Sequence, residues 1–186
     1  DNVAYRRDSL DAQTVARIAN IFNNNRQFTD AIDVTECYRL SDTTSVDVNR
    51  QNAKAYCMLK DYKKAIERYE SLKRMGDRSF LTFYYLGISY YGDNWFYGSY
   101  DNLKEAYAKN STDINVLYYY AKSCSRTSWK KEGVEFMEKA VEIATPGDSI
   151  LERLYKGLAE CYGYAGESYK KIEVMNRLYK LNKDYK

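Results

Sequence analysis

The stretch that decides the fold is VDVNRQNAKAYCMLKDYKKAIERYESLKRMGDRS, residues 46–79. Its apolar side chains follow the three- and four-residue spacing of amphipathic helices on both sides of a break at Lys60-Asp61. A small residue, Ala53, stands in the middle of the first helix. Gly76 follows the second helix, at the place where glycine commonly ends a helix. The stretch therefore predicts two helices joined by a short turn.

The same pattern recurs along the chain every 34 residues, and the period lengthens once, to 38. The small residue of the first helix recurs at Ala19, Ala53, Gly87, Ala121 and Ala159. A larger core residue follows it by three positions, at Phe22, Tyr56, Tyr90, Cys124 and Tyr162. One helix pair buries too little apolar surface to be stable alone, so neighbouring pairs must stack. The periodicity therefore predicts an all-α array of stacked helix pairs.

Five repeats account for nearly all of the 186 residues. Their predicted ranges are 12–45, 46–79, 80–113, 114–147 and 152–185. Four additional residues, 148–151, indicate that the first helix of repeat 5 is lengthened at its start, with Asp148 or Ser149 as its cap. Residues 1–9 match the tail of a preceding repeat, and no polar capping helix follows Tyr185. We therefore expect the chain to be part of a longer array.

These columns resemble the tetratricopeptide repeat, whose units are helix–turn–helix pairs of 34 residues. The resemblance implies a right-handed α-solenoid of stacked antiparallel helix pairs, a single superhelical array over residues 1–186. The sequence departs from the family pattern at Lys130 and Ser168, where an aromatic residue is expected, and at Ser99 and Lys171, where alanine is usual. In the family the first helices line the concave side, where extended peptides or partner helices bind.

The composition excludes several classes of function. The chain has 29 Lys and Arg residues against 26 Asp and Glu residues, so no strong field favours nucleic acid or a membrane surface. No apolar run approaches the roughly 20 residues of a membrane span. Histidine is absent from the sequence, which removes the commonest general base and every Ser–His or Cys–His nucleophile. We therefore predict a non-enzymatic protein without a cofactor, either cytoplasmic or exported after removal of a signal peptide.

The four cysteines do not form a recognisable metal site. They are widely spaced, include no Cys-x-x-Cys pair, and have no histidine to complete a zinc site. Cys124 occupies a column that is aromatic in the other four repeats, as a small core residue would. We interpret the cysteines as structural residues and expect no bound metal.

The strongest functional signal is the concentration of tyrosine in repeats 3 and 4. Ten of the 21 tyrosines fall within residues 84–120. The first helix of repeat 3 is apolar on the face opposite its core stripe, which is typical of a buried or an interacting helix. We predict a tyrosine-lined, partly basic partner-binding face on the first helices. Its candidate residues are Arg50, Lys54, Leu81, Tyr84, Tyr85, Ile88, Tyr91, Tyr118, Tyr119, Lys122, Arg126, Arg153 and Lys156.

The leading hypothesis is a scaffold that binds a peptide or a partner protein on this face. Tyrosine supplies rigid contact area, and Lys54, Lys122 and Arg126 would favour acidic residues or a C-terminal carboxylate. Binding of a small ligand or glycan through exposed tyrosines is an alternative, and so is a purely structural role with self-association through the array ends. The tyrosines could also only pack between adjacent first helices. The chaperone-type carboxylate clamp of the family is not expected, because two of its matching positions hold Tyr85 and Tyr119.

Overall fold

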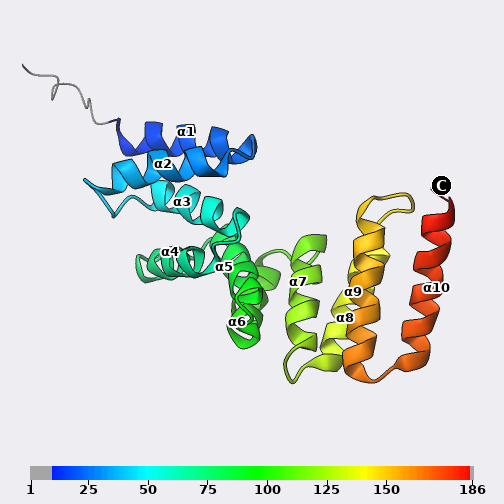
Figure 1. Ribbon diagram of the computed structural model, residues 1–186. Coiled ribbons are helices and arrows are strands. Elements are labelled where there is room, and N and C mark those ends of the chain that lie inside the picture. The colour runs from blue at the N-terminus through cyan, green and yellow to red at the C-terminus, as the bar shows by residue number, and fades with distance from the viewer. Residues whose placement is uncertain (1–9, 185–186) are drawn as a thin grey trace, which may run out of the picture. The chain divides into compact units, whose positions relative to one another are not determined.

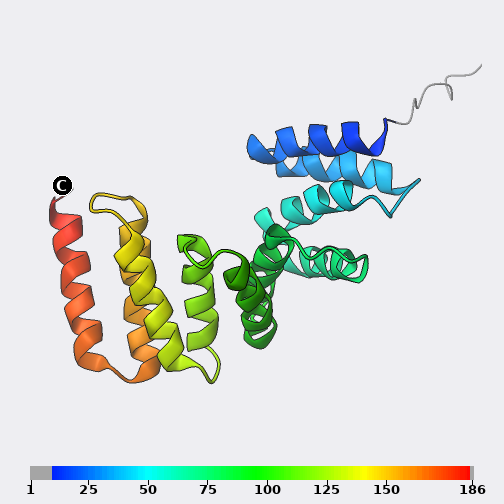
Figure 2. The same ribbon diagram turned by 180° about the vertical axis from the view of Figure 1, so that it is seen from behind.

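The computed structural model describes residues 10–184, which form ten α-helices and no β-strand (Figures 1 and 2). The helices are α1 (Ala12–Asn24), α2 (Phe28–Arg39), α3 (Val46–Met58), α4 (Tyr62–Arg74), α5 (Phe80–Gly92), α6 (Phe96–Lys109), α7 (Ile114–Ser125), α8 (Lys130–Ile143), α9 (Ile150–Ala165) and α10 (Ser168–Asp184). The all-α fold class and the predicted helix pairs are confirmed. The predicted tail of a preceding repeat, residues 1–9, lies outside the described residues.

Polar side chains at the predicted breaks begin several of the helices. Asp11, Ser45, Asp61, Ser79 and Asp113 each accept a hydrogen bond from a backbone N–H in the first turn of the helix that follows. These bonds satisfy donors that have no partner inside the helix. The starts of the first helices α1, α3, α5 and α7 are therefore encoded locally, whereas among α2, α4, α6 and α8 only α4 begins with such a cap.

Helix α9 differs in detail from the prediction. With the 38-residue spacing, a helix equivalent to α7 would span residues 152–163, whereas α9 spans Ile150–Ala165. The predicted lengthening at the start is thus present and amounts to two residues, and two further residues extend the end of the helix. Ser149 occupies the N-cap position without a side-chain hydrogen bond, and the Asp148 carboxylate instead accepts from the backbone N–H of Ile150 at 3.0 Å.

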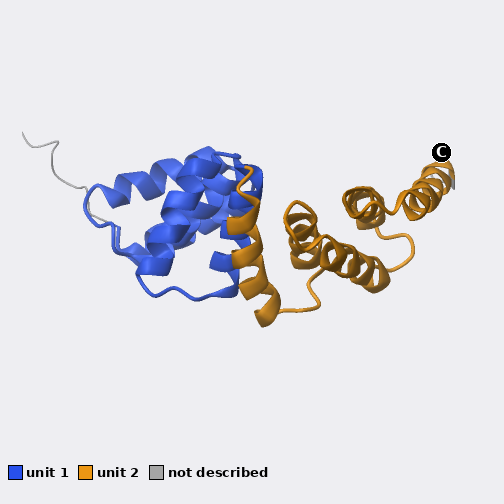
Figure 3. Cartoon of the chain, turned by 90° about the horizontal axis from the view of Figure 1, so that it is seen from below, with its two compact units in different colours: residues 1–93 blue, residues 94–186 orange. Residues whose placement is uncertain are grey.

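The helices pack into two compact units, residues 1–93 and residues 94–186 (Figure 3). Unit 1 contains α1 to α5, and unit 2 contains α6 to α10. The boundary falls in the turn of repeat 3, next to Gly92. The single array over residues 1–186 stays a prediction.

The small-residue column lies in the core of each repeat. Ala19, Ala53 and Ala121 are fully buried, and Gly87 and Ala159 are also buried. In unit 1, Ala53 packs in one cluster with Tyr69 and Leu72 of α4. A small side chain at this column lets the two helices of a pair approach closely, and larger neighbours fill the remaining space.

A tyrosine–glutamate hydrogen bond joins one repeat to the next. The Tyr56 hydroxyl donates to Glu36 at 3.0 Å, and the Tyr90 hydroxyl donates to Glu70 at 2.8 Å. Tyr162 makes the equivalent bond to Glu138. Each bond links the first helix of a repeat to the second helix of the repeat before it. Burial, followed by the bond to Glu36, raises the pKa of Tyr56 to about 12.

The junction between α6 and α7 is built differently, because the equivalent positions are Lys104 and Cys124. An aromatic cluster occupies this part of unit 2, with two of its rings stacked at a centroid distance of 4.0 Å. The cluster consists of Tyr100, Tyr107, Tyr120, Trp129 and Phe136. We call it the junction cluster.

Candidate functional site

The candidate residues of unit 1 lie on α3 and α5, and the basic residue Arg50 is engaged within the protein. Arg50 donates to both carboxylate oxygens of Asp77, with Nε–Oδ2 at 2.7 Å and Nη2–Oδ1 at 2.9 Å. Such two-point pairing is the strongest common arrangement for a guanidinium group. Arg50 also contacts Asp47 at 3.2 Å. Its charge is therefore balanced by two carboxylates of unit 1.

Asp77 is the buried centre of this arrangement. Its side chain is 1% exposed and also accepts from the backbone N–H of Ser79 and from the Thr82 hydroxyl. Burial opposes ionisation, but the hydrogen bonds from Arg50, Ser79 and Thr82 outweigh it and hold the pKa of Asp77 well below its usual value. Arg50 thus ties α3 to the turn before α5, which is a structural role.

The apolar face of α5 divides into packed and accessible positions. Tyr85 stacks on Tyr69 of α4 at a centroid distance of 6.2 Å, and burial raises its pKa. Ile88 packs against the same cluster. Tyr84 is half-buried and stacks on Phe80 at 5.8 Å, whereas Leu81 is exposed. Lateral packing therefore accounts for Tyr85 and Ile88.

The remaining candidates of unit 1 are Lys54 and Tyr91. Lys54 lies one turn after Arg50 on α3, and Tyr91 lies in the last turn of α5. Both side chains are half-buried. The candidate residues of unit 1 that remain accessible, such as Leu81 and Lys54, thus do not form a cluster of basic groups.

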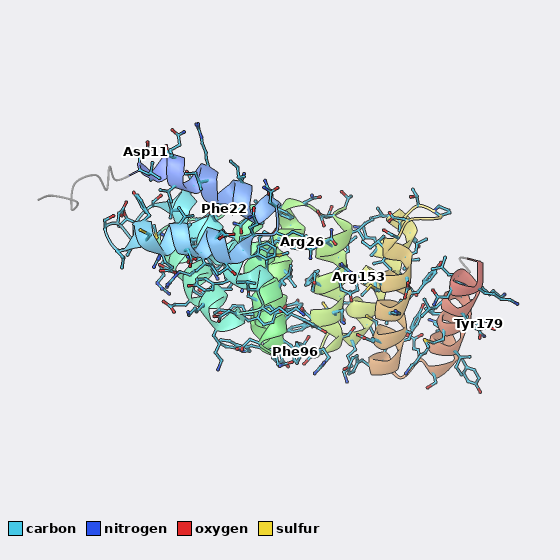
Figure 4. The ribbon with its side chains drawn as sticks, turned by 45° about the horizontal axis from the view of Figure 1, so that its top comes forward. Asp11, Phe22, Arg26, Phe96, Arg153 and Tyr179 are labelled. Carbon is cyan, nitrogen blue, oxygen red and sulfur yellow. The ribbon has the colours of Figure 1, made fainter. Side chains whose placement is uncertain are left out.

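In unit 2 the candidate residues lie on α7 and α9, which pack against each other. Arg153 projects from α9 toward α7 (Figure 4). Its guanidinium carbon lies 4.2 Å from the ring centroid of Tyr118 and 5.6 Å from that of Tyr119. Its Nη2 donates to Asn115 Oδ1 at 3.1 Å, and the residue remains exposed. Two aromatic rings and one amide therefore hold an accessible cation in a defined position.

Close approach of α9 to α7 depends on Gly157. A Cβ atom at this position would lie 2.9 Å from the Tyr118 ring and 2.8 Å from the Met137 methyl group. Tyr118 is half-buried and meets Tyr119 edge-on at 5.2 Å. Tyr118 therefore has a supporting role, because its ring packs against α9 at Gly157 and contacts the Arg153 guanidinium.

The other basic candidate residues on α7 and α9 differ in their surroundings. Lys122 is paired with Glu160 at 2.9 Å, and its side chain is only 16% exposed. Lys156 is exposed and pairs with Glu152 one turn earlier. These two lysines are thus balanced by carboxylates on α9.

Arg126 caps the end of α7 and is exposed. Its guanidinium carbon lies 4.1 Å from the Phe96 ring centroid and 5.4 Å from that of Tyr164. Aromatic rings therefore support Arg126 as they support Arg153, and no described carboxylate lies within ion-pair distance of either arginine.

The residues that decide which cations are accessible were not among the predicted site residues. Asp77 and Glu160 neutralise candidate cations, while Asn115, Phe96 and Tyr164 position arginines. The only signal in the sequence was the repeat register itself, which places residues 38 apart, such as Asn115 and Arg153, on adjacent first helices.

The described residues offer little support for other chemistry. Among residues 10–184 no group of three or more His, Cys, Asp or Glu side chains is arranged to hold a metal ion. Cys57, Cys124 and Cys161 are buried, and burial raises the pKa of the Cys124 thiol to about 12. Within the same residues, none of the helices combines the length and the apolar character needed to cross a membrane.

The chain is similar in structure to proteins that share little of its sequence. One is YrrB, described as a tetratricopeptide-repeat protein with an unusual peptide-binding site, with 16% identity, a TM-score of 0.79, and coverage of 97% of this chain and 91% of YrrB. Another is MamA, from its residue 41 to the end, from Desulfovibrio magneticus RS-1, with 15% identity, a TM-score of 0.78, and coverage of 93% and 96%. No protein-family model matches the chain. No curated protein matches its sequence.

Proposed function

Because the chain has the tetratricopeptide-repeat fold, we propose that it is a non-enzymatic scaffold that binds an acidic peptide on the α7–α9 face of unit 2. We define this face as Asn115, Tyr119, Arg126, Arg153 and Lys156. The observation that supports it best is Arg153, an exposed guanidinium held over two tyrosine rings and bonded to Asn115.

A positioned arginine favours a carboxylate ligand for two physical reasons. Its planar fork matches the two oxygens of a carboxylate, and a side chain already held by rings loses less conformational entropy on binding. The Tyr118 and Tyr119 rings also leave fewer water molecules around the guanidinium, which strengthens the ion pair. An aspartate, a glutamate or a C-terminal carboxylate would fit this site.

The neighbouring groups support an extended ligand more than a single small anion. Arg126 is a second supported cation at the end of α7, and Tyr164 beside it is exposed. Tyrosine and arginine together are the residue types that dominate binding energy in protein interfaces. In unit 1, Leu81 and Lys54 remain as secondary candidates, whereas Arg50 is engaged by Asp77.

The test is a selection of random dodecapeptides displayed on phage, with the 186-residue chain as the immobilised target. Affinities of the enriched peptides would then be measured by fluorescence polarisation with wild type, Arg153→Ala, Tyr119→Ala and Lys104→Ala. Lys104→Ala is the matched control, because it also removes one exposed positive charge but lies on α6. Circular dichroism would verify equal helix content.

We expect the enriched peptides to contain Asp, Glu or a required free C-terminus. Arg153→Ala should weaken their binding by about tenfold or more, the usual effect of removing a central arginine contact, whereas Lys104→Ala should change it by less than about twofold. Peptides that bind Arg153→Ala as well as wild type would refute the proposed face. A failure to enrich any peptide would refute the proposed peptide-binding function.

A further inference from the structure

The last helix carries an apolar stripe that no described residue covers. Ile172, Met175 and Tyr179 of α10 are 60%, 47% and 68% exposed. Tyr179 projects away from α9 (Figure 4). The spacing of three and four residues places these side chains on one face of the helix. Exposed apolar residues on one helix face indicate an interaction surface.

The repeat register shows what kind of partner this stripe lacks. The position of Met175 is occupied in the earlier second helices by Thr35, Tyr69, Leu103 and Met137, and all four are at most 2% exposed. Met137 is covered by Leu154 and Leu158 of α9, the first helix of the next repeat. The stripe on α10 is therefore half of an inter-repeat interface, and a first helix is the matching half.

The first helix of the chain carries such a matching half. Ile21 of α1 is 58% exposed, although the equivalent residues of the later first helices are all fully buried. Those residues are Ala55, Ser89, Ser123 and Cys161. Ala55 packs against Ala19 and Ala31 of the preceding repeat, which shows that this position faces the preceding helix pair. Ile18 and Phe22 flank Ile21 and are only half-buried.

We propose that the chain associates with a second copy of itself head to tail, with the α10 stripe of one copy packed on the α1 face of the next. We define the α1 face as Ile18, Ile21 and Phe22. Contacts of this kind use two different surfaces, so a pair joined by one contact still offers one free surface of each kind. Such a contact produces a closed assembly where the rotation between copies closes, and a chain of increasing length where it does not.

The distribution of charge favours this pairing over a symmetric one. Helix α10 contains five basic and two acidic residues, a net charge of +3. Residues 10–45, which form the first helix pair, contain three arginines and five carboxylates, a net charge of −2. Two copies of α10 side by side would repel each other. The first helix pair as a whole attracts α10, although its carboxylates lie mainly on α2 and α1 itself carries only the charge of Arg17.

The test uses sedimentation velocity on the 186-residue chain at low salt, from about 10 μM to about 500 μM, a range suited to a small interface. Wild type is compared with Met175→Asp, which changes the α10 stripe, and Ile21→Asp, which changes the α1 face. Leu40→Asp is the matched control, because Leu40 is exposed and its equivalents, Arg74, Ala108 and Glu142, are exposed too. Circular dichroism would verify that each variant is folded.

The average mass of wild type and of Leu40→Asp should rise with concentration above that of the monomer. Met175→Asp and Ile21→Asp should each remain at 21.8 kDa when alone. A one-to-one mixture of the two should form a dimer and nothing larger, since only one intact pair of surfaces remains. A wild type that stays monomeric at about 500 μM would overturn the proposal. Self-association of Ile21→Asp alone, or a mixture that stays monomeric, would equally overturn it.

Discussion

The pairing of Arg50 with Asp77 should contribute strongly to the stability of unit 1, and Asp77→Ala is the change that tests it. The substitution removes an acceptor of four hydrogen bonds, two of them from the Arg50 guanidinium. The Thr82 hydroxyl is fully buried, so it would lose an acceptor at a place that water does not readily reach.

The magnitude follows from burial. Removal of one partner from a fully buried ion pair costs about 3–5 kcal/mol, because the other charge is left without compensation. Arg50 is 36% exposed and also contacts Asp47, so water and Asp47 compensate part of its charge. We therefore expect Asp77→Ala to lower the free energy of unfolding by about 2–3 kcal/mol at pH 7. Asp47 is 71% exposed, and Asp47→Ala should cost less than about 0.5 kcal/mol.

The effect should also depend on pH, with a sign fixed by the low pKa of Asp77. A carboxylate whose pKa is lower in the folded protein binds fewer protons when folded than when unfolded. Its stabilisation is complete above the pKa of the unfolded chain, about 4, and is lost as the pH falls toward the folded value. The difference between wild type and Asp77→Ala should therefore shrink as the pH is lowered from about 5 to about 2.5.

Urea denaturation followed by circular dichroism at several pH values would measure these differences. Asp77→Asn should fall between wild type and Asp77→Ala, because an amide oxygen can still accept from Ser79 or Thr82 but carries no charge. If Asp77→Ala costs no more than Asp47→Ala, or if its cost is the same at pH 7 and pH 2.5, the reasoning on this pair is refuted.

Three further predictions concern single residues. Tyr90→Phe should lower the free energy of unfolding by about 1 kcal/mol through loss of the bond to Glu70, and a urea titration in which it matches wild type would contradict that role. Gly76→Ala should lower the free energy of unfolding by about 1 kcal/mol, because the φ of +91° at this residue strains any side chain even where nothing lies nearby. Gly163→Ala, in a helix where the added Cβ would make ordinary contacts, should not destabilise the protein in the same assay. Titration with Ellman's reagent should detect one thiol in the native protein, Cys37, and three more after unfolding, so rapid native reaction of a second thiol would show that the buried cysteines are accessible.

The helices could be predicted from sequence because their signals are local. The small-residue column, the apolar spacing and the turn residues recur in every repeat. A repeat that departs from the pattern at one position can therefore still be assigned from its neighbours. The length of α9 was predicted less well, because an insertion of four residues can be divided between the loop and either end of the helix. Such a division depends on packing and not on local preference.

The candidate face was harder to predict because it depends on pairs of side chains from different repeats. Arg50 and Asp77 are 27 residues apart, and Lys122 and Glu160 are 38 apart. The register places each pair on neighbouring elements, but rotamers and local burial decide which charges meet. The sequence therefore indicates cations on the first helices but does not distinguish Lys122, which Glu160 neutralises, from Arg153, which two rings support.

The tyrosines of unit 2 divide between packing at the junction of α6 and α7 and the proposed binding face. Where a tyrosine–glutamate bond joins repeats, this polar contact adds to the packing of the junction. Where both partners are replaced, as at Lys104 and Cys124, the stacked rings of the junction cluster occupy this place. Tyr120 belongs to that cluster and is buried, whereas Tyr119, its neighbour in sequence, lies on the α7–α9 face beside Arg153. Successive residues of a helix point about 100° apart, so a run of tyrosines necessarily divides between packing and surface. Substitution of Tyr120 should therefore affect stability, and substitution of Tyr119 should affect binding.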